Sequence, residues 1–121
     1  MKKILITGAN SYIGTSFEKY IGMNYPQGYL VDTVDMIGDG WKQKDFGEYD
    51  CIFHVAGIAH SDSGKISQEK ERLYYAVNTD LTVETAKKAK ADAKKAEAAA
   101  KAEAEEIKTK LEAEGAKVNL K

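Results

Sequence analysis

The sequence has one cysteine, Cys51, one proline and no long apolar run among its 121 residues. A single cysteine excludes a disulfide within the chain, so a cytoplasmic location is the simplest expectation. The longest nearly apolar stretch, CIFHVAGIA, is too short to span a bilayer. The few apolar residues that follow Lys2 and Lys3 do not make a signal peptide. A net charge of −1 gives no general attraction to nucleic acid or to membranes.

Aromatic residues are absent from the last third of the chain, where the composition also changes. Every residue from Ala86 to Glu106 is Ala, Lys, Glu or Asp. Residues 1–85 carry 8 Lys and Arg against 12 Asp and Glu, whereas residues 86–121 carry 10 against 7. We interpret the chain as a single domain, 1–121, that joins two kinds of sequence. Residues 1–90 resemble a natural globular protein, and residues 91–121 have the regularity of a designed helix and strand.

Apolar patterns in the first half predict alternating strands and helices. KKILIT, GYLVDTVD and DCIFHVAG are of strand length, and the first is apolar enough to lie at the centre of a parallel sheet. Ile13, Phe17 and Ile21 recur at helical spacing between the first two strands. WKQKD at 41–45 is at most a short edge strand, because too few residues precede it for a crossover helix.

Glycine and proline are also absent between Ser67 and Gly115, which predicts one long helix. An unbroken helix over 67–114 would be about 72 Å long at about 1.5 Å per residue. This exceeds the width of a domain of this size, so we expect the helix to project into solvent; a break near 90–100 is the alternative. Its core-facing row is expected to consist of Leu73, Val77, Leu81 and Ala86.

These elements predict a truncated Rossmann-like α/β fold with three layers and a mainly parallel sheet. The expected strand order is 3-2-1-4-5, with 41–45 as strand three and 117–120 as strand five. Val118 and Leu120 alternate with lysines and asparagine, as in an edge strand. The sheet edge and the long helix both offer surfaces on which a homo-oligomer could form.

The segment ITGANSYIG, residues 6–14, has the outline of a phosphate-binding loop between a strand and a helix. Gly8 would form the sharp turn, and Gly14 would let the helix lie close to the strand. Ser11 occupies the position where such loops often have a third glycine; its small side chain is tolerable and can cap the helix. Free N–H groups at the helix start would face a diphosphate. The alternative is an ordinary strand–helix turn with two glycines.

Asp35 strengthens the dinucleotide interpretation. It lies 21 residues after Gly14 and closes the second strand, where an acidic residue would accept hydrogen bonds from the adenosine ribose hydroxyls. Its carboxylate would repel a 2′-phosphate, which favours NAD over NADP. The alternative is that Asp35 only forms a turn before MIGDG.

Four motifs in order make residues 1–90 resemble the N-terminal half of an extended short-chain dehydrogenase/reductase, of the NAD-dependent sugar epimerase/dehydratase group. They are ILITGANSYIG, KDF, DCIFHVAGIAH and YYAVNTDLTVETAKKAK, with Asn78 as the marker of the last. The resemblance implies an NAD(P)-binding site made by the residues Gly8, Asn10, Ser11, Tyr12, Ile13, Gly14, Asp35, Asp45, Phe46, Val55, Ala56 and Gly57. In it, Asp45 would meet the adenine, Phe46 would line the pocket, and 55–57 would run beside the cofactor.

The residues that the family's reaction requires are missing. None of the tyrosines is followed by a lysine four positions later, and the family's substrate lobe is absent. We therefore expect weak or vestigial NAD binding without catalysis. The alternative function is an engineered chimeric scaffold or assembly module without a ligand, and a third is an enzyme completed in trans by its missing half. His54, His60 and Cys51 are best explained as structural residues, because they lack the spacing of metal ligands.

Overall fold

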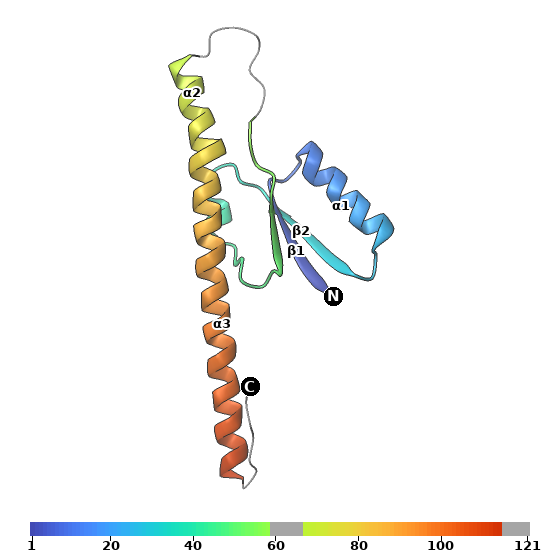
Figure 1. The fold of residues 1–121 in the computed structure, drawn as a ribbon, viewed down its shortest axis with the longest axis vertical. Helices are drawn as coiled ribbons and strands as arrows, with labels where there is room; N and C mark the ends of the chain where they lie inside the picture. Colours follow the sequence, from blue (N-terminus) through green and yellow to red (C-terminus); the bar gives the residue numbers. More distant parts are fainter. Residues whose placement is uncertain (59–66, 115–121) are drawn as a thin grey trace.

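The structure is a computed structural model that describes residues 1–58 and 67–114 (Figure 1). In chain order its elements are β1 (Lys2–Thr7), α1 (Tyr12–Asn24), β2 (Tyr29–Val34), the 3₁₀ turn η1 (Gly40–Gln43), β3 (Cys51–His54), α2 (Gln68–Tyr75), the π turn η2 (Ala76–Asp80) and α3 (Leu81–Ala113). The fold class is α/β, as the alternating patterns predict.

The three strands form a parallel sheet in the order β2-β1-β3. Leu5, in the middle of β1, is opposite Asp32 on β2 and Ile52 on β3. Leu5 and Ile6 are fully buried because helices cover both faces of the sheet. The prediction that KKILIT forms the central strand is therefore confirmed.

The expected five strands and the order 3-2-1-4-5 are wrong for the described residues, because the sheet has three strands. Residues 41–45 do not form a strand: the Trp41 indole N–H donates to the Gly38 carbonyl at 3.1 Å within the turn around η1. Trp41 and Phe46 are both buried and pack with ring centroids 6.3 Å apart. Burying both rings favours a compact turn over an extended strand. The strand expected at 117–120 lies outside the described residues.

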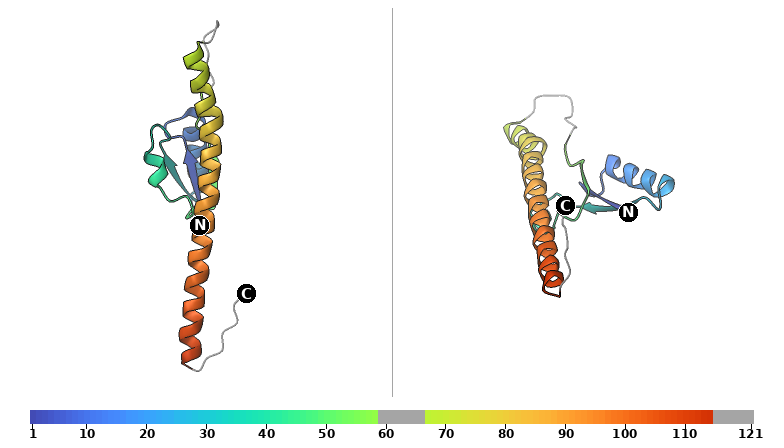
Figure 2. Two further views of the ribbon diagram at one scale, coloured as in Figure 1. Left: turned by 90° about the vertical axis from the view of Figure 1, so that its left-hand side faces the viewer. Right: turned by 60° about the horizontal axis from the view of Figure 1, so that its bottom comes forward.

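Helices on opposite sides of the sheet give three layers (Figure 2). On one side, Leu5 clusters with Met36, Trp41 and Phe46 beneath α3. On the other side, Phe17 of α1 meets Phe53 of β3 with ring centroids 4.8 Å apart.

The buried row of α1 differs from the expected one. Gly14 and Ile21 are buried and Phe17 is half-buried, whereas Ile13 is 61% exposed. A Cβ added at Gly14 would lie 3.1 Å from Ile6 Cγ2. The glycine thus marks the closest approach of α1 to β1, and this turns Ile13 away from the sheet.

The chain is helical without a break from 68 to 113, and the lower part of α3 extends beyond the sheet (Figures 1 and 2). The prediction of a projecting helix is confirmed. Its buried row is only partly as expected, because Leu73 is 53% exposed and Ala86 is exposed. Thr85 is buried instead; its hydroxyl donates to the Leu81 carbonyl at 2.7 Å, and this bond makes burial of a polar side chain tolerable.

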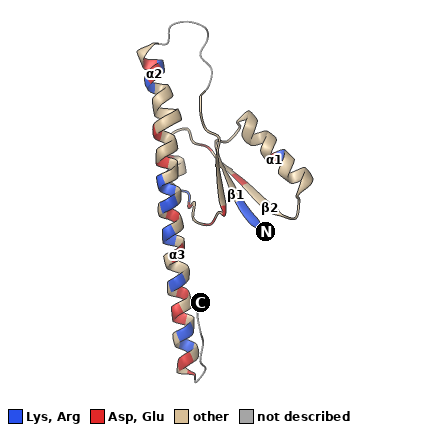
Figure 3. Cartoon of the chain, in the orientation of Figure 1, with Lys and Arg blue, Asp and Glu red and all other residues tan. Residues whose placement is uncertain are grey.

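Charged residues cover α3 from the sheet to its distal end (Figure 3). Its packing against residues 1–58, which we call the sheet domain, nevertheless continues past residue 90, where the composition changes. A Cβ at Gly47 would lie 2.5 Å from the Asp92 carbonyl oxygen and 3.0 Å from Ala96 Cβ. The repetitive sequence is therefore part of the packed structure as far as Ala96.

Candidate functional site

The loop after β1 has a backbone that only glycine fits easily. Gly8 has φ +132°, and a Cβ there would lie 2.8 Å from the Ala56 backbone nitrogen. Asn10 also has a positive φ, +61°, which asparagine tolerates better than most residues. The N–H groups of Gly8 and Ala9 both donate to the Val34 carbonyl of β2, at 2.9 and 3.2 Å. These contacts hold the loop against both neighbouring strands.

Ser11 caps α1, as the sequence predicts. Its hydroxyl oxygen accepts from the Gly14 N–H at 3.0 Å and its proton is directed to the Gly8 carbonyl at 3.1 Å. The backbone N–H groups of Tyr12 and Ile13, in the first turn, have no acceptor within the helix. The hydroxyl is thus engaged within the loop, whereas backbone donors remain at the helix start.

A cavity of about 470 Å³ opens at the carboxyl ends of the three strands. This end of a parallel sheet is where open α/β folds bind ligands. The cavity brings together six of the predicted site residues: Gly8, Ser11, Asp35, Val55, Ala56 and Gly57. We call it the strand-end cleft. Its described lining is mainly apolar and includes one acidic side chain at the border.

Asp35 provides that acidic side chain. It is exposed, and one of its carboxylate oxygens, Oδ1, accepts from the Ile37 N–H at 2.9 Å. This is the turn-forming contact of the simpler interpretation. It leaves Oδ2 available at the border of the cleft, so the turn role and a ribose-binding role are compatible.

The other predicted residues lie elsewhere. Asn10 and Gly14 border a smaller cavity of about 310 Å³ on another side of the loop. Tyr12 and Ile13 are 87% and 61% exposed at the start of α1, and their side chains do not line the strand-end cleft. At these positions, Tyr12 and Ile13 can contact a ligand in the cleft only through their backbone N–H groups.

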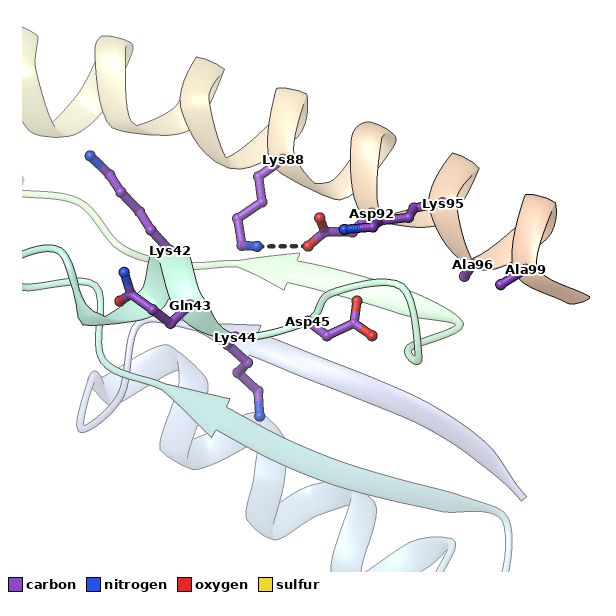
Figure 4. A pocket seen from close by; sticks show the side chains of 9 residues that line it. All are labelled: Lys42, Gln43, Lys44, Asp45, Lys88, Asp92, Lys95, Ala96 and Ala99. Atoms are coloured by element: carbon purple, nitrogen blue, oxygen red, sulfur yellow. Dashed lines mark hydrogen bonds and ion pairs between the residues drawn. The ribbon is translucent and has the colours of Figure 1, made fainter.

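Asp45 and Phe46 are also separated from the strand-end cleft. Asp45 borders a polar cavity of about 470 Å³ between the 42–45 segment and α3, where its Oδ1 accepts from the Gly47 N–H at 2.8 Å (Figure 4). Phe46 is buried in the core, and Lys88 Nζ lies 4.7 Å from its ring centroid. The structure therefore does not bring these two residues to the site that the resemblance implies.

The polar cavity is organised by a pair on α3 (Figure 4). Lys88 Nζ donates to Asp92 Oδ2 at 2.7 Å, and both side chains are largely buried. Burial opposes ionisation of Asp92, but the hydrogen bonds from Lys88 and from the Phe46 N–H outweigh it and hold the pKa of Asp92 below its ordinary value. This pair attaches the helix to the 42–47 segment.

His54 connects β1, β3 and α3 through a chain of hydrogen bonds. Thr7 Oγ1 lies 2.7 Å from His54 Nδ1, and His54 Nε2 lies 3.2 Å from Thr82 Oγ1. Because the Thr82 hydroxyl donates to the Asn78 carbonyl at 3.1 Å, we assign the proton of the imidazole to Nε2. Burial lowers the pKa of His54, which favours this neutral form. The prediction of a structural histidine agrees with these contacts.

Asn78 holds one wall of the strand-end cleft. Its side-chain amide donates to the Ile58 carbonyl at 2.7 Å and accepts from the Ile58 N–H at 2.9 Å. A side chain at Gly57 would approach Asn78 Oδ1 to 3.2 Å. The π turn η2, which contains Asn78, therefore fixes the segment after β3, and such turns are frequent near functional sites.

The cleft also has apolar walls that the sequence interpretation assigned to other roles or left out. These walls are formed by Met36, Ile37, Gly38, Ile58, Leu73, Val77 and Leu81. Ile37 is 88% exposed. The available signal was the apolar pair Met36–Ile37 between Asp35, which closes the predicted strand, and Gly38. The row 73–77–81 was recognised, but it was assigned to the core instead of a cleft wall.

Comparisons with protein-family models, curated proteins and solved structures found no match to this chain. Within residues 1–58 and 67–114, no group of three or more His, Cys, Asp or Glu side chains is arranged to hold a metal ion. None of the helices in these ranges combines the length and the apolar character needed to cross a membrane.

Proposed function

We propose that the strand-end cleft binds the adenosine diphosphate half of an NAD-type dinucleotide weakly, and that the chain does not catalyse a reaction. The observation that supports this most directly is the close approach of Gly8 to Ala56. It leaves no space for a side chain where the turn meets the cleft. The space that a side chain would need is taken by Ala56, so Gly8 supports a tight strand–helix turn, and a diphosphate would approach the start of α1 from the cleft side.

The diphosphate would be bound by backbone donors. The first N–H groups of α1, at Tyr12 and Ile13, lie at the positive end of the helix dipole. No acidic side chain occupies the first turn of α1, so nothing on the helix itself repels the anion there. The affinity is expected to be low because none of the described residues that line the cleft is a cation that could pair with the phosphates.

Asp35 would select the nucleotide. Oδ2 would accept from a ribose hydroxyl while Oδ1 keeps the Ile37 N–H. The same charge would oppose a 2′-phosphate, and this gives NAD preference over NADP. Asp45 and Phe46 have no part in this proposal, because they lie outside the cleft.

The absence of catalysis is inferred from the sequence. The motif Tyr-x-x-x-Lys, which the resembled family uses for acid and base chemistry, does not occur in the chain. Without such a pair, a bound dinucleotide would have no partner for the proton that accompanies hydride transfer. Purified protein is expected to show no dehydrogenase or epimerase activity.

Calorimetric titration with NAD, NADP and ADP tests the proposal. We expect millimolar binding of NAD and ADP and weaker binding of NADP. Asp35→Asn keeps an acceptor for the Ile37 N–H but removes the charge, so it should weaken NAD about tenfold and reduce the preference over NADP. Glu105→Gln, which removes one charge from distal α3, should change neither affinity. Absence of heat with millimolar NAD and ADP would refute the proposal.

A second candidate function is a scaffold or assembly module without a ligand. The observation that favours it is the length of α3, which continues well past its last close approach to the sheet domain at Ala96. This candidate predicts no response to nucleotides and a surface for association on the distal helix. The same titration therefore distinguishes the two functions.

A further inference from the structure

The polar cavity between the 42–45 segment and α3 has more positive than negative side chains in its described lining (Figure 4). The whole chain, in contrast, has a net charge of −1. Residues 87–101 of α3, which pass the cavity, contain six lysines against one aspartate and one glutamate (Figure 3). The local charge therefore attracts anions. The charged lining residues are Lys42, Lys44 and Asp45 from the segment, and Lys88, Asp92 and Lys95 from α3.

We propose that the polar cavity binds a small multivalent anion with the chemistry of a diphosphate group. Its volume of about 470 Å³ is in the range of small-molecule sites. Two lysines come from each wall, so a ligand with two charged groups can contact both walls at once. No described residue lines both this cavity and the strand-end cleft. The proposal therefore does not depend on dinucleotide binding in the cleft.

The α3 wall holds two ammonium groups near one carboxylate. Lys88 Nζ donates to Asp92 Oδ2 at 2.7 Å, and Lys95 is near enough for its charge to act on the same carboxylate. These three residues follow at intervals of four and three, which places them on one helix face. The Phe46 N–H also donates to Asp92 Oδ2, at 2.9 Å. Asp92 thus balances one lysine, and the second positive charge remains for a ligand.

The lysines of the opposite wall make weak contacts. Lys42 Nζ lies 3.1 Å from Asp39 Oδ1, but the two side chains are 48% and 84% exposed, so water screens the pair. Lys44 Nζ lies 5.4 Å from the ring centroid of Tyr49, on the side of the segment away from α3 (Figure 4). Because lysine has a long, flexible side chain, both ammonium groups can turn from these contacts to an anion.

Asp45 is the residue of the cavity that opposes an anion. Its Oδ1 accepts from the Gly47 N–H at 2.8 Å, which holds the carboxylate at the cavity wall. We therefore expect weak binding, with a dissociation constant of about 1 mM for pyrophosphate at low salt. The same repulsion supplies a test, because Asp45→Asn removes the charge and keeps an acceptor for the Gly47 N–H.

Titration of the isotope-labelled full chain with pyrophosphate, followed by its backbone amide NMR signals, tests the location. The signals of residues 42–47 and 88–96 should shift, whether or not those of residues 8–14 shift as well. Shifts confined to 8–14 would overturn the proposal and leave the strand-end cleft as the site for a diphosphate. Absence of any shift up to about 10 mM pyrophosphate would also overturn it.

Two substitutions with opposite effects test the charges. Lys95→Gln should weaken pyrophosphate binding about three- to tenfold. Asp45→Asn should strengthen it by a similar factor, a gain that a misfolded variant would not show. Lys110→Gln and Glu105→Gln are the matched controls and should leave the affinity unchanged. Lys110 is fifteen residues past Lys95, about 22 Å along the helix axis and well beyond the range of screened charges.

The controls also define the results that would contradict a specific site. Equal weakening by Lys95→Gln and Lys110→Gln would show attraction to the lysines of α3 in general and would overturn the proposal. Unchanged affinity in both Lys95→Gln and Asp45→Asn would overturn it as well.

Titration with ADP distinguishes the two sources of a diphosphate group. None of the described lining residues is aromatic, so a base has no ring to stack on, and ADP should shift residues 42–47 no more tightly than pyrophosphate does. Tighter binding of ADP there would identify a nucleoside diphosphate as the ligand. Asp35→Asn, which alters the strand-end cleft, should leave the shifts of 42–47 unchanged. A loss of these shifts in Asp35→Asn would overturn the proposal of a separate site.

Discussion

The Asp92 carboxylate of α3 accepts a hydrogen bond from the Phe46 backbone N–H at 2.9 Å. Asp92 belongs to the run of Ala, Lys, Glu and Asp, whereas Phe46 is only 2% exposed in the aromatic-rich part of the chain. Lys88 donates to the same carboxylate. The two kinds of sequence are thus joined by a specific, largely buried contact, and the repetitive helix is more than an appended spacer.

Asp92→Ala should destabilise the fold by about 1.5–3 kcal/mol. It leaves the Phe46 N–H and the Lys88 ammonium without their acceptor in a largely buried place. Urea unfolding followed by tryptophan fluorescence measures this, because Trp41 packs beside Phe46. Glu97→Ala, on an exposed part of the same helix, should change the unfolding free energy by less than about 0.5 kcal/mol. Equal effects of the two variants would show that the contact is unimportant.

Gly47→Ala should be more damaging than Gly40→Ala. The added Cβ at Gly47 would lie 2.5 Å from the Asp92 carbonyl oxygen, so α3 would have to move away from the 42–47 segment. Overpacking of this kind costs about 1–3 kcal/mol. No atom lies within 4 Å of the corresponding position at Gly40. Thermal unfolding of both variants checks the prediction, and a Gly47→Ala protein as stable as Gly40→Ala would contradict the close approach.

Stability should fall as the pH drops below about 6.5 because of His54. Burial lowers the pKa of His54 in the folded state below the value of about 6.5 that it has when unfolded. Between the two values the unfolded chain binds a proton that the folded chain does not, so falling pH favours unfolding. The stabilising contribution is complete above about pH 6.5 and is lost as the pH falls through the folded pKa.

His54→Asn tests the assignment. Asparagine can still accept from the buried Thr7 hydroxyl but does not titrate. The difference in unfolding free energy between pH 7.5 and pH 5.5 should therefore decrease in this variant. His60→Asn changes the other histidine of the chain and serves as control. Asp92 does not interfere, because its pKa is lowered from an already acidic value. An unchanged pH dependence in His54→Asn would contradict the prediction.

Local patterns predicted the elements well and the sheet less well. KKILIT and the run without glycine or proline gave β1 and the long helix correctly, because hydrophobic content and helix propensity act over short distances. Segment 41–45 was misassigned, because the burial of Trp41 and Phe46 beneath α3 is a tertiary effect. The sequence does not show which surface either aromatic ring will contact.

The same division applies to the site. Gly8, Ser11 and Asp35 could be placed from their spacing, because the turn after β1 and the end of β2 meet at one edge of a parallel sheet. Asp45 and Phe46 were assigned by resemblance to a motif, whereas the chain between β2 and β3 places Phe46 in the core and Asp45 beside α3. Leu73 and Val77 were recognised as apolar, but whether an apolar helix residue joins the core or lines a cleft depends on what lies opposite it, which the local pattern does not show.

Replacing Ser11 by glycine should increase the affinity for NAD and leave the stability of the fold nearly unchanged. The Ser11 hydroxyl is engaged with the Gly14 N–H and the Gly8 carbonyl, so it cannot donate to a phosphate without losing a bond inside the loop. Ser11→Ala, which removes the cap but keeps the Cβ, should lower the free energy of unfolding by about 1 kcal/mol. Ser11→Gly should change it by only a few tenths of a kcal/mol. Since glycine also removes the Cβ beside the cleft, Ser11→Gly should bind NAD about two- to fivefold more tightly, whereas Ser11→Ala should not. Calorimetry with NAD and thermal unfolding of the wild type and both variants test the prediction. Weaker NAD binding by Ser11→Gly than by Ser11→Ala would show that the phosphate does not approach this position.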